Sequence, residues 1–159
     1  MQEHIQNELA SFIANCDWEK IAPHFKEDAA YRVLDWIGCA VAGEHYPQVE
    51  IAQKYFIENG DQGNSTVIGH QTKCSPRTAA FLNGIAGHVC ELDDGHRTAI
   101  GHPGSIAVPT ALALGEHLNA SGADVLKAVI LGYEVFSRLG RTVNPSHYRT
   151  WHKTGTFGT

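Results

Sequence analysis

The chain has 159 residues, a length that predicts about one domain. Hydrophobic residues make up 43% of it and charged residues 18%, so it can bury a core and is not a disordered tail. The formal net charge of −5 argues against broad binding to nucleic acid or an anionic membrane, since both require a basic surface.

The ends and the cysteines of the chain predict a cytoplasmic protein. The N-terminal residues carry two acids early and have no apolar core behind a basic flank, so they do not form a secretion signal. The longest uncharged stretch near the middle, residues 98–115, is shorter than the about 20 apolar residues that span a bilayer. The four cysteines form no C-x-x-C pair and no metal-like spacing, which predicts reduced core residues.

Apolar residues recur at helical spacing almost throughout, which predicts an all-α fold. A first short helix ends near residues 15–17. A second runs from Pro23, a favourable first helical residue, to Gly43, and a third ends at Asn59.

The one convincing extended segment is residues 65–69, which comes directly after residues typical of a turn. Ser75 and Pro76 then open a fourth helix, as N-cap and first helical residue, and we expect this helix to run through Leu92. A polar loop, residues 93–102, follows it.

Pro103 begins a fifth helix that Asn119 closes, and Ser121 caps a long sixth helix. The sixth helix reaches at least Leu139, and Asn144-Pro145 breaks it. Its side chains are apolar nearly all round, and such a helix is normally buried by neighbouring elements on every side.

The last residues, 155–159, are typical of a cap that precedes a further helix. Together with the apolar sixth helix, they predict that residues 1–159 are part of a larger helical domain. The alternative is a complete small bundle with a frayed tail.

The densest polar stretch, residues 91–103, places three carboxylates, two imidazoles and one guanidinium in a single connection between helices. Glu91 and Asp94 share a face if the fourth helix extends that far. Small residues on that face, Gly84 and Gly87 among them, allow a neighbouring helix to approach closely. Asp93 and Asp94 can instead simply cap backbone groups at the helix end.

His102 has a more specific geometry, because Pro103 forces it into an extended conformation and starts the next helix. It therefore sits at a helix N-terminus, beside the backbone N–H groups of Gly104 and Ser105. This arrangement suits a substrate carboxylate.

A second polar cluster, residues 147–156, mixes aromatic and basic side chains. His152 next to Lys153 would provide an acid/base group beside a cation. This pairing is useful for removing a proton next to a carboxylate, where the developing negative charge needs stabilisation.

Blander interpretations apply to the remaining polar residues. His96 and Arg97 are expected to form a solvated loop pair, and His88 to be a satisfied core histidine. Ligand types alone allow a metal site of four side chains: Asp93, Asp94, His96 and His102. No spacing fixes these ligands on a helical face, so no metal site is predicted. No phosphate-binding loop or serine nucleophile elbow is present.

Several short motifs, read together, resemble the MmgE/PrpD (2-methylcitrate dehydratase-like) family over essentially the whole chain. They are DWIGCAVAG at 35–43, NGIAGH at 83–88, ELDD at 91–94, HPG at 102–104, GYEV at 132–135 with RLG at 138–140, and HKTGTFGT at 152–159.

The resemblance implies a large all-helical domain and a smaller α/β lid domain, usually in a homodimer and working without metal or organic cofactor. Residues 1–159 would be the N-terminal segment of the helical domain, without its remainder and without the lid. Family activities include dehydration of 2-methylcitrate, decarboxylation of cis-aconitate and epimerisation of iminodisuccinate, each at carbon next to a carboxylate of a small polyanion.

Carried over by position, Glu91 and Asp94 line the acidic turn, and His102 and His152 resemble the two active-site histidines; these four are the expected catalytic residues. The expected substrate-binding residues are Asp93, Gly104, Ser105 and Lys153.

The resulting expectation is a carbon–oxygen lyase of propionate catabolism that dehydrates 2-methylcitrate or a similar tricarboxylate. The chain would carry part of the active site and be inactive in isolation. Glu91 stands where many members have Asp, Gly95 where many have Thr, and one extra residue separates Asp94 from His102. These departures weigh most against a decarboxylase.

The first alternative is another activity of the same family, decarboxylation of cis-aconitate or epimerisation of iminodisuccinate. Two other classes of function also stay open. A non-catalytic helical domain or interaction module is the first alternative outside the family activities, and a metal-dependent hydrolase ranks behind it.

Overall fold

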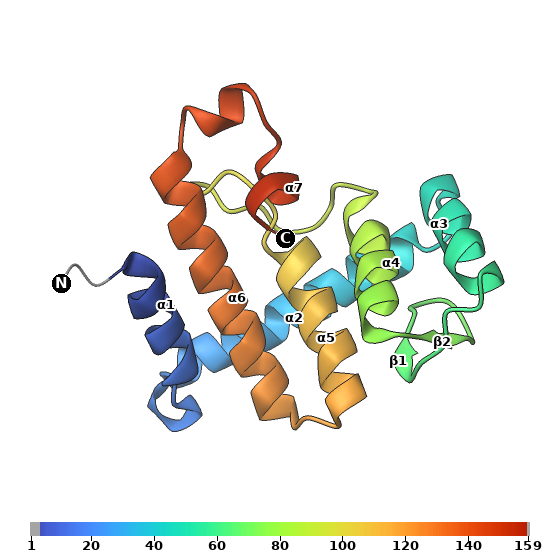
Figure 1. Cartoon of the computed structure of the whole chain (residues 1–159), viewed down its shortest axis with the longest axis horizontal. Helices are drawn as coiled ribbons and strands as arrows, with labels where there is room; N and C mark the ends of the chain where they lie inside the picture. Colours follow the sequence, from blue (N-terminus) through green and yellow to red (C-terminus); the bar gives the residue numbers. More distant parts are fainter. Residues whose placement is uncertain (1–3, 159) are drawn as a thin grey trace.

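A computed structural model describes residues 4–158, and within them the fold is helical with one two-stranded sheet, as predicted (Figure 1). The α-helices are α1 (Ile5–Ala14), α2 (Pro23–Gly43), α3 (Pro47–Glu58), α4 (Pro76–His88), α5 (Gly104–Leu118), α6 (Gly122–Val143) and α7 (Lys153–Phe157). Two short 3₁₀ helices are Trp18–Lys20 and His147–Arg149. The strands β1 (Ser65–Thr66) and β2 (Lys73–Cys74) pair antiparallel.

Helix ends follow the predicted capping chemistry. The Ser75 hydroxyl accepts a hydrogen bond from the Thr78 N–H at the start of α4, and Ser121 accepts one from Asp124 at the start of α6. Asn119 ends α5 in the left-handed conformation. These ends confirm the predicted limits of the helices to within a few residues.

Two local predictions were wrong, and a third was confirmed but incomplete. Helix α4 ends at His88 and does not reach Leu92, which is exposed. The extended segment is one strand of a hairpin whose second strand, β2, the sequence pattern did not indicate. A short helix, α7, already begins at Lys153, where a cap further on was expected.

The centre of the fold is α4, which packs against α2 on one side and α5 on the other. Gly87 makes the first contact possible, because a Cβ built there would lie 2.4 Å from the Trp36 indole nitrogen. A Cβ on Gly84 would similarly lie 3.1 Å from the Ser105 carbonyl oxygen of α5. The prediction that these small residues allow close helix packing is confirmed.

In Figure 1, α4, α5 and α6 stand side by side across α2, and their shared core includes Trp36, Ala86, Val108 and Val129. The connection between α4 and α5 lies at one end of these helices, where α7 also lies. The packing therefore brings the two predicted polar clusters to the same end of the molecule. No described helix is both long and apolar enough to cross a membrane.

Candidate active site

The candidate site is built around Asp93, whose side chain is completely buried in the connection between α4 and α5. Its carboxylate lies between two imidazoles. Nδ1 of His88, at the end of α4, lies 2.9 Å from Oδ1, and Nδ1 of His102, just before α5, lies 3.5 Å from Oδ2. The two rings are close to each other, with centroids 4.6 Å apart.

This arrangement controls which imidazole nitrogens are available. The Asp93 carboxylate accepts a hydrogen bond from Nδ1–H of His88. This bond fixes the orientation of the ring and leaves Nε2 facing away from the carboxylate. Nδ1 of His102 is buried and has no hydrogen-bond partner among the described residues, although it lies at ion-pair distance from Asp93. His102 is thus close to a buried carboxylate without being fully engaged by it.

Helix α7 brings the second polar cluster to the same place. The backbone N–H of His102 donates to the Thr154 hydroxyl over 3.0 Å, although 52 residues separate the two. The ring of His152, an exposed residue directly before α7, lies 6.3 Å from the His88 ring between centroids. Two imidazoles therefore contact one buried carboxylate, and a third lies beside the first of them.

Lys153, the first residue of α7, is fully buried. Its Nζ has no hydrogen-bond partner among the described residues and lies 5.6 Å from the centre of the Tyr148 ring. Burial lowers the pKa of this amine, because leaving water disfavours the charged form. A negatively charged group that reached this amine would relieve that cost.

Asp94 faces a different set of partners. Its Oδ2 accepts from Nη1 of Arg32 in α2 over 2.9 Å, and its Oδ1 accepts from the Gly104 N–H over 3.0 Å. Tyr133 of α6 also hydrogen-bonds Asp94. Burial, and then the charge of Asp94, raises the pKa of Tyr133, so this phenol stays protonated. Only glycine fits at 104, since a Cβ there would lie 2.5 Å from Oδ1 of Asp94.

The backbone groups predicted to bind a substrate carboxylate are therefore partly in use. The Gly104 N–H already binds Asp94, and the buried Ser105 hydroxyl donates to the His102 carbonyl over 2.8 Å. Ser105 thus fixes the His102 carbonyl, and Gly104 ties the start of α5 to Asp94. Asp94 does bind a backbone group, but at the start of α5, so the interpretation that it caps the end of α4 was wrong.

Glu91 does not lie on helix α4, where the sequence pattern placed it. It follows the end of α4 with a φ of 49°, and its side chain is exposed. The expected common helical face of Glu91 and Asp94 is absent, because the helix stops at His88.

His88 was misjudged as a core histidine. Its side chain is 25% exposed and binds Asp93. The signal that could have identified it is position, since a histidine in the last turn of a helix points into the connection that follows. Among its neighbours in that connection, Arg97 is exposed as predicted, whereas Nδ1 of His96 accepts from the Ala99 N–H over 3.0 Å and orders the loop.

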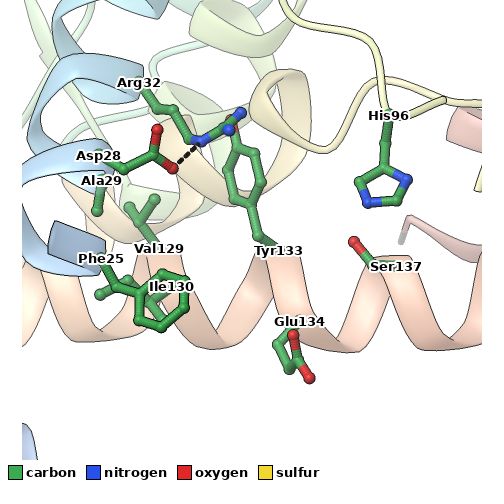
Figure 2. A pocket seen from close by; sticks show the side chains of 10 residues that line it. All are labelled: Phe25, Asp28, Ala29, Arg32, His96, Val129, Ile130, Tyr133, Glu134 and Ser137. Atoms are coloured by element: carbon green, nitrogen blue, oxygen red, sulfur yellow. Dashed lines mark hydrogen bonds and ion pairs between the residues drawn. The ribbon is translucent and has the colours of Figure 1, made fainter. Parts of the chain in front are cut away.

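A surface pocket lies on the Asp94 side, between α2, α6 and His96 (Figure 2). Figure 2 shows the Tyr133 ring beside Arg32, whose guanidinium is bonded to Asp28. In this pocket Arg32 already pairs with two carboxylates, Asp28 and Asp94, so its positive charge is balanced within the protein. The Asp93 side is therefore the better candidate for chemistry on an anionic substrate.

Comparisons with known proteins agree with the motifs. The MmgE/PrpD N-terminal domain family matches residues 7–159. A cis-aconitate decarboxylase-like protein of Aspergillus oryzae is 30% identical over 98% of the chain and 34% of its own length. The cis-aconitate decarboxylase of Aspergillus terreus is 31% identical over 97% of the chain and 33% of its length, and the human one 35% identical over 67% and 23%. The chain thus spans about a third of these fungal relatives.

Proposed function

The chain belongs to the MmgE/PrpD family, and on that basis we propose that it carries the histidine–aspartate part of a lyase active site for a small tricarboxylate. The observation that carries the proposal is the buried Asp93 carboxylate with His88 and His102 beside it and His152 next to His88. The remaining groups needed for turnover would come from sequence that the longer relatives have beyond this segment.

Among the family activities, decarboxylation of cis-aconitate is the better candidate. The matched relatives carry that name, whereas dehydration of 2-methylcitrate rests on the motif resemblance alone. Two of the departures that weighed against a decarboxylase, at Glu91 and Gly95, fall on exposed positions. They therefore change the surface of the connection and not the surroundings of Asp93.

Decarboxylation breaks the bond between the carbon skeleton of the substrate and one of its carboxylate carbons. CO₂ leaves, the electrons of the broken bond stay on the substrate skeleton, and that skeleton takes up one proton. Dehydration instead removes a proton from carbon next to a carboxylate and expels hydroxide as water. Both reactions need a group that holds a proton beside an anionic substrate, and histidine serves this purpose near neutral pH.

In this proposal Asp93 orients His102, which transfers the proton through Nε2, as a buried carboxylate does for a catalytic imidazole. His152 is the second proton-transfer group. Lys153 binds a substrate carboxylate, which would supply the missing partner of its buried amine. Asp94, Gly104 and Ser105 hold the start of α5 in place, and Glu91 has no role.

The test is product analysis on the protein as its native source produces it. Incubation with cis-aconitate and, separately, with 2-methylcitrate is followed by detection of CO₂ and by mass spectrometry of the remaining acid. Release of CO₂ from cis-aconitate supports the proposal, and loss of water from 2-methylcitrate supports the second candidate. If neither acid reacts, the non-catalytic helical module becomes the better interpretation.

A further inference from the structure

Three side chains of the site also have the chemistry of a metal-binding set. His88, Asp93 and His102 each offer one ligand atom, and these atoms all lie within 4.8 Å of one another. Two imidazole nitrogens and one carboxylate oxygen form a typical set for Zn²⁺ and similar transition-metal ions. This set differs from the one considered from the sequence, because Asp94 is bound to Arg32 and His96 to its own loop.

The spacing of the ligand atoms fits a tetrahedral ion. Ligands about 2.0–2.2 Å from zinc lie roughly 3.3–3.6 Å from each other. Nδ1 of His88 lies 3.1 Å from Oδ2 of Asp93, and Nδ1 of His102 lies 3.5 Å from the same oxygen. Small rotations of the two rings would therefore bring all three atoms to bonding distance from one ion.

Charge and availability favour the same conclusion. A buried carboxylate needs a positive partner, and neither a lysine nor an arginine among the described residues is paired with Asp93 in an ion pair. Nδ1 of His102 has no hydrogen bond to lose among those residues. Both imidazoles remain 25% exposed, so an ion can reach them from solvent and keep one position for water or for nearby His152.

We propose that His88, Asp93 and His102 bind one Zn²⁺ ion and that this ion inhibits the enzyme. The inhibitory half of the proposal rests on the proposed function, because it assumes that His102 and Asp93 handle the proton of the reaction. Zinc would neutralise the Asp93 carboxylate, whose charge otherwise balances the transferred proton. It would also bind Nδ1 of His102, the nitrogen through which Asp93 orients that ring. The metal-loaded site therefore excludes the proton-transfer geometry.

Binding is tested with the metal alone. Co²⁺, which absorbs visible light when bound by nitrogen and oxygen in a tetrahedral site, is titrated into the native protein and then displaced with Zn²⁺. We expect one ion per chain. Binding should be about 10–100-fold weaker in His88→Gln and in His102→Gln, because even the loss of a residue that only supports a metal ligand has an effect of this size. The matched control is His45→Gln, which removes an exposed histidine elsewhere.

Circular dichroism of each variant establishes that it is folded. Absence of a visible Co²⁺ spectrum in the native protein would overturn the proposal, and so would equal affinity in both folded ligand variants. Inhibition is then measured as loss of CO₂ release against Zn²⁺ concentration, with a midpoint expected at the spectroscopic dissociation constant. Turnover that persists with zinc bound overturns the inhibitory half. Zinc binding to a protein that acts on neither tricarboxylate leaves the site standing and removes the proposed function instead.

Discussion

Asp93 and Asp94 are consecutive residues whose carboxylates have opposite surroundings. Asp94 binds Arg32, the Gly104 N–H and Tyr133, so its acceptor positions are taken by groups from α2, α5 and α6. Asp93 faces imidazoles, and its contact with His102 is longer than a well-formed hydrogen bond.

The difference separates structural from chemical roles within one turn of chain. A carboxylate that is fully paired with fixed donors stabilises the fold and is hard to use in a reaction. A buried carboxylate beside partly engaged imidazoles is arranged for proton transfer. We therefore assign anchoring to the Asp94 side and chemistry to the Asp93 side, and the predictions below test this division.

The largest effect is expected from His102→Gln, which keeps the size of the side chain but removes its proton-transfer chemistry. Turnover of the native protein should fall by about 10²–10⁴-fold, the usual contribution of a general acid or base. The turnover of the His152→Gln variant should fall by a factor in the same range. Steady-state rates are compared with those of His117→Gln, an exposed histidine bonded to Asn64. Rates of both variants within a few-fold of this control would contradict the assignment.

On the anchoring side, Asp94→Ala should act on stability. It leaves the Gly104 N–H and part of the Arg32 guanidinium without their partner, and an unpaired buried donor costs about 1–3 kcal/mol. Urea unfolding should show a loss of this size, whereas Asp28→Ala, which removes an exposed partner of Arg32, should lose less. A variant with unchanged stability and abolished turnover would move Asp94 to the chemical side.

Lys153→Met sharpens the comparison from the chemical side, where the buried amine lacks a partner among the described residues. A thioether of similar length avoids the cost of burying an amine, so the free energy of unfolding should rise. The rise should exceed the roughly 0.5 kcal/mol typical of surface changes, represented by the exposed control Lys20→Met. KM for the tricarboxylate should rise at the same time. A loss of stability would mean that the amine is satisfied in the protein.

The helices were predictable from the sequence because their signals are local. Ser75 with Pro76, Asn119 and Ser121 each fix a helix end through bonds within a few residues. The limit of α4 was missed because Leu92 continues the apolar period although the backbone has already turned at Glu91.

The candidate site was predictable only in part. His102 was found because the following proline fixes its place, and His152 because the motif resemblance includes it. Arg32 and Tyr133 were missed, since their meeting with Asp94 depends on how α2 and α6 cross, 62 residues apart in the case of Arg32. His88 was missed because its role depends on Asp93 turning back toward α4.

The smallest effect is expected from Tyr133→Phe, which removes one hydrogen bond to Asp94 and should cost about 0.5–1.5 kcal/mol near pH 8. The cost should shrink at high pH. Burial and Asp94 raise the pKa of Tyr133 above its ordinary value of 10.0, so beyond that pH the unfolded chain releases this proton while the folded one keeps it. The contribution of the phenol to stability is thus complete below pH 10 and lost as the pH rises further. Urea unfolding of both proteins at about pH 8 and pH 10.5 measures the difference, in which the titration of other groups cancels. A difference that stays constant would show that Tyr133 ionises normally and that the anchoring side is less closed than its contacts indicate.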